Sequence, residues 1–171
     1  ALGVELGLVA LSVMAAKTAL ALTAIGEESA QIEAKFRAFS GGAVKAAENF
    51  RIMDAVIGNA LDNDEKMIAV SRIMGLELAQ NAQQAADMAQ AAIWLGDSMQ
   101  TPTQRIDRFT QILVTGRTVG LADYGLAIAP IRDRMAELQK AITGLTDQQA
   151  LSIAVMEAAA VKMAALKAEG Y

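Results

Sequence analysis

The hydrophobic and polar residues of this chain follow two different patterns along its length. Residues 1–25, ALGVELGLVALSVMAAKTALALTAI, are almost entirely apolar, with Glu5 and Lys17 as their only charges. After residue 26, apolar residues recur every three or four positions between charged ones, which is the period of an amphipathic α-helix. The pattern therefore predicts an all-α fold: a long apolar N-terminal helix followed by a compact bundle of about six short amphipathic helices.

A break at Ser40-Gly41-Gly42 divides the chain into two predicted regions. Residues 1–40 would hold the hydrophobic helix, with the capacity to insert into a membrane, and residues 41–171 would form the helical bundle module. The apolar run starts at residue 1 without an initiator Met, and the chain ends abruptly in Ala-Glu-Gly-Tyr. We therefore expect this chain to be a segment of a longer protein.

The apolar N-terminal segment has the length of a membrane-spanning helix, which needs about 20 apolar residues. Gly3 and Gly7 form a GxxxG spacing that lets helices approach closely. Lys17 opposes insertion, since a lysine near mid-span costs on the order of 3 kcal/mol. Three interpretations remain: a buried helix in a larger helical assembly, a membrane helix, or a signal-peptide remnant, which the lack of preceding basic residues disfavours. The candidate residues for membrane contact or helix packing are Gly3, Gly7, Leu8, Leu11, Met14, Lys17, Leu20 and Leu22.

Local signals mark where several of the later helices begin. In Thr101-Pro102-Thr103-Gln104, Thr is the N-cap, Pro takes the first helical position and Gln completes a capping box. Thr146-Asp147-Gln148-Gln149 predicts another such start. Asp62-Asn63-Asp64-Glu65 also suggests a calcium loop, but Lys66 stands where a further oxygen ligand is needed. We therefore interpret Asp62 as a helix cap.

A narrow seam of small and flexible apolar residues is expected on the helix that begins after Asn81. Its members, three or four positions apart, are Met88, Ala92, Leu95 and Met99. Such small residues let a neighbouring helix pack closely. Trp94 lies off the seam, and we interpret it as part of the core or its rim.

The composition excludes several classes of chemistry. The 171 residues contain no His and no Cys, which excludes disulfides, thiolate nucleophiles, Cys/His zinc sites and a Ser-His-Asp triad. The net charge of −4 and the pI near 4.9 argue against sequence-specific nucleic-acid binding, which requires a basic surface. We accordingly predict no catalytic residue, no metal site and no cofactor.

Positive charge concentrates in one third of the chain and alternates there with carboxylates. The residues are Arg105, Arg108, Arg117, Arg132 and Arg134, with Asp107, Asp123, Asp133 and Glu137 between them. We interpret this pattern as a solvated surface with local ion pairs; contact with an acidic partner or with nucleic acid is the alternative.

A succession of short segments resembles the central region of tape measure proteins from long-tailed bacteriophages. These segments are Ala82-Gln83-Gln84-Ala85-Ala86-Asp87-Met88-Ala89, Leu95-Gly96-Asp97-Ser98-Met99, Arg108-Phe109-Thr110, Thr115-Gly116-Arg117, Leu121-Ala122-Asp123-Tyr124-Gly125-Leu126 and Leu145-Thr146-Asp147-Gln148-Gln149-Ala150. The resemblance extends over residues 1–165 and lies in the order and character of the helices.

The resemblance implies a structural role in the virion. Tape measure proteins occupy the lumen of the tail tube, set its length and leave ahead of the DNA, and their hydrophobic segments help to cross the host inner membrane. The implied partners are tail tube and tail tip proteins, other copies of the chain and the host inner membrane. Because glycines and Pro102 interrupt the helices, this region would be a folded module beside a membrane-competent helix and not the ruler itself.

Two other classes of protein share the predicted helices. One is a non-viral scaffold or interaction module, which would lack neighbouring genes for tail proteins. The other is a pore-forming helical bundle, which would release the contents of lipid vesicles on its own.

Overall fold

The structure, a computed structural model, describes residues 28–170, which form α-helices and 3-10 helices and no strand. The α-helices are α2 (Glu28–Ser40), α3 (Ala43–Ile57), α4 (Asn63–Gly75), α5 (Ala82–Leu95), α6 (Pro102–Thr115), α7 (Ile128–Ala141) and α8 (Asp147–Ala168), and the 3-10 helices are η1 (Gly58–Ala60) and η2 (Thr118–Tyr124). The predicted all-α class is confirmed. The predicted apolar helix lies outside the described residues, as do its candidates Gly3, Gly7, Leu8, Leu11, Met14, Lys17, Leu20 and Leu22.

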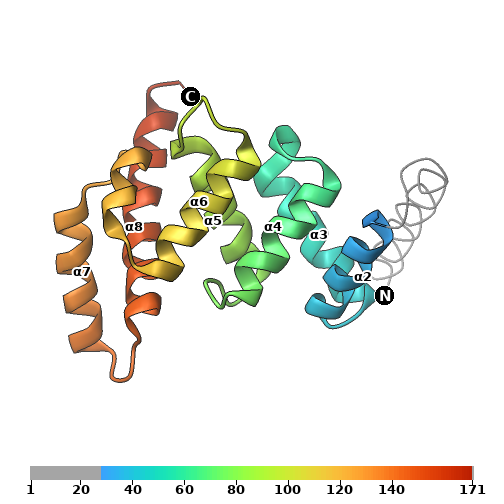
Figure 1. The fold of residues 1–171 in the computed structure, drawn as a ribbon, viewed down its shortest axis with the longest axis horizontal. Helices are drawn as coiled ribbons and strands as arrows, with labels where there is room; N and C mark the ends of the chain where they lie inside the picture. Colours follow the sequence, from blue (N-terminus) through green and yellow to red (C-terminus); the bar gives the residue numbers. More distant parts are fainter. Residues whose placement is uncertain (1–27, 171) are drawn as a thin grey trace.

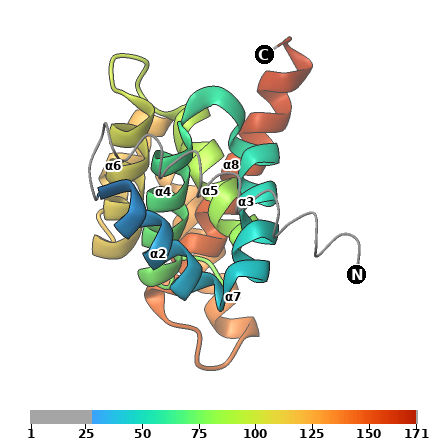
Figure 2. The same ribbon diagram turned by 90° about the vertical axis from the view of Figure 1, so that its right-hand side faces the viewer.

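The helices lie side by side in a row (Figure 1). From one end of the molecule to the other they pass from α2, through α3 and α4, to α5 and α6, and then to α8 and α7, and Figure 2 shows the same row end-on. α2 packs against both α3 and α4, and α7 packs chiefly against α8. α5 is central, since it contacts α3, α4, α6 and α8.

The central helix α5 is built mainly from alanine. Six of its alanines are no more than 3% exposed: Ala82, Ala85, Ala86, Ala89, Ala91 and Ala92. The distance between two packed helices depends on the side chains at their contact, and alanine permits the shortest distances short of glycine. The composition of α5 therefore explains how four helices pack around one.

The predicted helix starts are confirmed where a side chain caps the backbone. The side chains of Thr101 and Thr146 each accept a hydrogen bond from the backbone N–H of the glutamine three residues on. The side-chain oxygen of that glutamine in turn accepts from the threonine's backbone N–H, so both capping boxes are complete. The Asp62 side chain accepts from the Glu65 N–H at 2.8 Å, which confirms its interpretation as a cap. Asn81 caps α5 in the same way. These bonds satisfy backbone donors that lack a partner within the helix.

One member of the predicted α5 seam is placed wrongly by the sequence. Met88, Ala92 and Leu95 are buried, but Met99 lies beyond the end of α5 and is 90% exposed. The helix ends because Gly96 adopts an extended backbone and the Asp97 carboxylate accepts from the Met99 N–H at 2.9 Å, which turns the chain. The seam therefore stops at Leu95.

The loop between α5 and α6 is held by the side chain of Arg105, a role that the sequence did not reveal. Its guanidinium donates to the carbonyls of Ile93 and Asp97, both at 2.7 Å, and also to those of Gln100 at 3.1 Å and Ser98 at 3.3 Å. One side chain thus satisfies the carbonyls around the end of α5 that have no helical partner. Arg105 is a structural residue and not part of a solvated charge pattern.

α7 begins at Ile128, two residues before Pro130. Pro130 therefore occupies the first turn, where its missing N–H leaves no helical hydrogen bond unmade. The helix ends at Ala141, ahead of Gly144, which has a φ of 83°.

Tyr124 joins η2 to α6 and gives the fold a pH-dependent contact. Its ring meets the edge of Phe109 with centroids 5.0 Å apart, and its hydroxyl donates to the Arg105 carbonyl at 2.5 Å. The pKa of the Tyr124 phenol is raised to about 12, chiefly by burial; the nearby Arg108 charge lowers this pKa and the Asp123 charge raises it. The neutral phenol is thus the form that the fold accommodates.

We expect the free energy of unfolding to fall at alkaline pH because of Tyr124. The raised pKa contributes stability below about pH 10, where the unfolded phenol is neutral, and that contribution is lost as the pH rises toward 12. Urea titrations at pH 9 and pH 11 should show an additional loss of about 1 kcal/mol relative to Tyr124→Phe. Equal losses in the two proteins would contradict this role.

Candidate helix-docking groove

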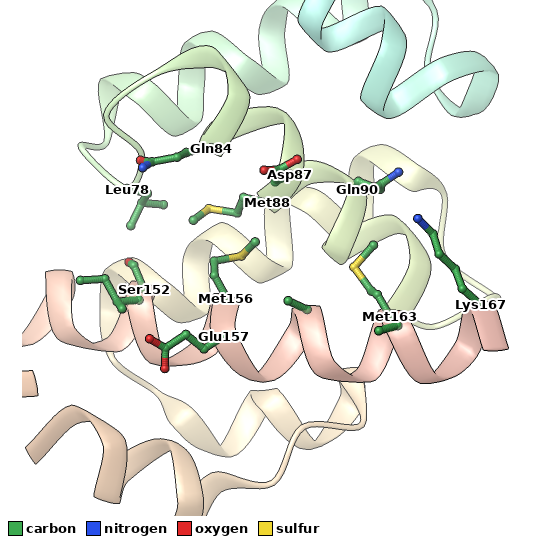
Figure 3. Close-up of a pocket in the computed structure, with 13 residues that line it drawn as sticks. Leu78, Gln84, Asp87, Met88, Gln90, Ser152, Met156, Glu157, Met163 and Lys167 are labelled. Atoms are coloured by element: carbon green, nitrogen blue, oxygen red, sulfur yellow. The ribbon is translucent and has the colours of Figure 1, made fainter. Parts of the chain in front are cut away.

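An open groove with a volume of about 620 Å³ lies between α5 and α8. Apolar side chains line it from both helices and from the α4–α5 loop: Leu78, Met88, Ile153, Met156, Met163 and two alanines of α8, Ala160 and Ala164. In Figure 3, Met156 and Met163 extend from α8 toward α5. α5 and α8 are separated by 51 residues of sequence, so only the folded chain brings these side chains together.

Methionine gives this groove an adaptable lining. Met88 is 2% exposed and forms part of the core, whereas Met156 and Met163 are half-buried. Methionine has three rotatable bonds and a polarisable sulfur, and it recurs on surfaces that bind helices of varied sequence. Grooves of this kind bind a helix through apolar residues at positions i, i+3 or i+4, and i+7.

Charged residues from both helices also line the groove. Asp87 on α5 and Lys167 near the end of α8 are at different points along it, and the Lys167 ammonium lies 5.6 Å from the centroid of the Trp94 ring. Such a cation–π contact holds the lysine stem against the protein. Trp94 is half-buried at this end, as its predicted place in the core or rim requires.

Glu157 borders the groove but is directed to the neighbouring helix. Figure 3 shows its carboxylate on the side of α8 away from Met156, and it accepts from Arg134 of α7 at 2.8 Å. The hydrogen bonds from Arg134 lower the pKa of Glu157, so the carboxyl is ionised and paired at neutral pH. The floor of the groove is consequently apolar.

A shallower hollow lies on the other flank of α8, against η2 and α7, with a volume of about 450 Å³. The Lys162 ammonium donates to the Gly125 carbonyl there, and Val161 is 73% exposed. By length and composition alone, α8 is the one helix of residues 28–170 that could cross a bilayer, with a third of its most apolar window buried. A core helix meets the same criteria, and the buried Leu151 and Val155 fit that interpretation.

The arginine-rich part of the chain forms ion pairs between neighbouring helices. Arg108 pairs with Asp123, and Arg72 pairs with Asp107. These side chains are about half exposed, so each pair contributes between zero and about 1 kcal/mol to stability. Arg134 pairs with Glu137 three residues on, which confirms a predicted local ion pair at that position.

The described part of the chain brings together no group of three acidic residues that could hold a metal ion. Of the predicted seam, Met88 lines the groove, whereas Ala92 and Leu95 are buried elsewhere in the core. The sequence did not predict the groove, because the positions of Met156 and Met163 do not indicate which helix packs against α8. No protein family, curated protein or solved structure matches this chain.

Proposed function

We propose that this chain is a non-catalytic, helix-docking structural module within the tape measure protein of a long-tailed bacteriophage. The observation that carries the docking role is the open groove between α5 and α8, with its methionine lining. The order of capped helices and the segments quoted above support the family. The groove would receive an apolar or amphipathic helix during tail assembly.

The proposed partners are the tail tube and tail tip proteins and further copies of the chain. Residues 1–25 would form an apolar helix that is covered by protein within the tail lumen. After ejection this helix would insert into the host inner membrane, since its length matches the hydrocarbon core of a bilayer. The module would therefore be both an assembly contact in the virion and a carrier of a membrane-active segment.

Substitution of Met156 by glutamate should prevent the module from joining assembled tails. A carboxylate on the groove floor would have to lose its water when a partner helix docks, which is costly without a charged partner. We expect the chain to co-sediment with tubes when it is co-expressed with the tail tube and tail tip proteins encoded beside it. Met156→Glu should lower the co-sedimenting fraction at least about ten-fold, which corresponds to about 1.4 kcal/mol.

Val119→Glu is the matched control, because Val119 is 76% exposed on η2 and does not line the groove. Circular dichroism of both variants establishes that they fold. Unchanged co-sedimentation of Met156→Glu would contradict docking at this groove. Neighbouring genes that encode no tail proteins would contradict the phage assignment and favour a non-viral scaffold, and vesicle leakage caused by the purified chain would favour a pore-forming bundle.

A further inference from the structure

A second groove lies between α2 and α4, at the opposite end of the molecule from α8 (Figure 1). We propose that residues 4–25 of the same chain dock in it as a helix. This inference goes beyond the proposed function, since it concerns a different surface and names an occupant from within the chain. The groove has a volume of about 770 Å³.

The lining of this groove contains features that an apolar helix would satisfy. Ile68 of α4 and Leu76, which follows the last residue of α4, remain 39% and 37% exposed, although both are large aliphatic residues. Ser71 also lines the groove, and its hydroxyl is buried without a hydrogen-bond partner among the described residues. An additional helix over this groove would cover the aliphatic side chains and bring a polar group to Ser71.

The place where the apolar segment joins the described chain directs it to this groove. The described part of α2 starts at Glu28, so the segment that ends at Ile25 is joined within two residues to a helix that forms one wall. Glycine readily adopts the backbone conformations that reverse a chain, and two antiparallel helices need only a short loop. A 22-residue helix would be about 33 Å long and would extend along the whole of α2.

A turn at residues 26 and 27 would fix which residue of the segment lies level with each residue of α2. α2 and α4 run in the same direction, since Ser29 at the start of α2 donates to Asp64 at the start of α4. Thr18 precedes Gly26 by as many residues as Lys35 follows Glu27, and Lys35 lines the groove beside Ser71. Thr18 would therefore come level with the unpartnered Ser71 hydroxyl.

The neighbouring levels match as well. By the same count, Leu22 comes level with Gln31 and its neighbour Ile32, and Ala15 comes level with Ala38. The opposite wall, on α4, includes the aliphatic Ile68 and the small Gly75.

The sequence of the segment presents one suitable face in a helix. At spacings of three and four residues, that face consists of Val4, Leu8, Leu11, Ala15, Thr18 and Leu22. Lys17 lies about 140° around the helix from Leu22, at 100° per residue, and would stay in water. Docking in the groove thus avoids the burial of Lys17 that a fully enclosed helix would impose.

The segment's own chain is favoured over a second copy. A helix tethered by two residues has an effective concentration in the millimolar range, above the working concentration of a separate copy. The groove also carries basic Lys35 and Arg72 on its walls, and the stripe that faces them has no basic residue. Docking within one chain therefore requires neither a partner nor a buried like-charge contact.

An engineered disulfide tests this arrangement in the full-length chain, which has no native cysteine. We expect Thr18→Cys with Ser71→Cys to form an intrachain disulfide on mild oxidation, seen as a faster-migrating monomer on a non-reducing gel and confirmed by mass spectrometry. Lys17→Cys with Ser71→Cys is the matched control, because residue 17 faces away from the groove. The first pair should react at least about ten times faster, at a rate independent of protein concentration.

Equal rates for the two pairs, or disulfide-linked dimers as the main product, would overturn the proposal, the second result assigning the groove to another copy. If circular dichroism shows that the first pair is unfolded, Leu22→Cys with Ile68→Cys replaces it, with Leu20→Cys and Ile68→Cys as its control. Tube co-sedimentation depends on the other groove, so failure here leaves the proposed function intact.

Discussion

Deletion of residues 1–25 should abolish binding of the chain to liposomes. Full-length protein should float with vesicles of phosphatidylethanolamine and phosphatidylglycerol, because a helix of 25 residues spans about 37 Å and the hydrocarbon core is about 30 Å thick. The truncated chain keeps α8, but that helix packs on the core through Leu151 and Val155, which are at most 1% exposed. We expect recovery in the floating fraction to fall at least about ten-fold, to the level seen without lipid.

Val161→Lys is the control for a contribution from α8, since Val161 is 73% exposed and a lysine there would oppose insertion of that helix. This variant should float like the unaltered chain. Flotation of the truncated chain would assign membrane binding to the described helices instead. Equal recovery of the full-length chain with and without lipid would defeat the insertion proposal altogether.

Phe109→Ala should lower the free energy of unfolding by about 3–5 kcal/mol. Phe109 is fully buried in α6, and its ring packs against the edge of Tyr124, which is itself 2% exposed. Truncation removes the ring from the core and leaves a cavity that α6 and η2 cannot close without moving apart.

Urea denaturation monitored by circular dichroism measures this loss, and Val114→Ala on the same helix is its control. Val114 is 42% exposed, so its truncation should cost less than about 1 kcal/mol. Similar losses for the two variants would show that the contact between Phe109 and Tyr124 does not hold η2 to α6.

The starts of the helices were predictable because they depend on contacts within four residues of sequence. Thr101 and Thr146 cap their helices through hydrogen bonds to positions three residues on, so the sequence contains both partners side by side. On α4, the buried Met67, Val70 and Ile73 likewise lie three residues apart in sequence, at the spacing of one helical face.

Contacts between distant segments were not predictable in this way. The spacing of apolar residues predicted that the α5 seam extends to Met99, which is exposed. Spacing alone does not show that the Asp97 side chain turns the chain two residues before Met99. Arg105 looked like one member of a charge pattern, but its hydrogen bonds run to carbonyls of a loop whose path the sequence does not reveal. The groove depends in turn on the pairing of α5 with α8, which neither helix specifies alone.

The alanine-built centre of the molecule has a consequence for how this sequence can vary. At each buried alanine of α5, every replacement except glycine adds atoms to a helix that packs against four others. Outer helices can exchange one large side chain for another by adjusting neighbours on a single side. A substitution at a buried alanine of α5 therefore requires simultaneous compensating substitutions on several helices. We expect α5 to keep its small residues while the sequences of the surrounding helices vary more.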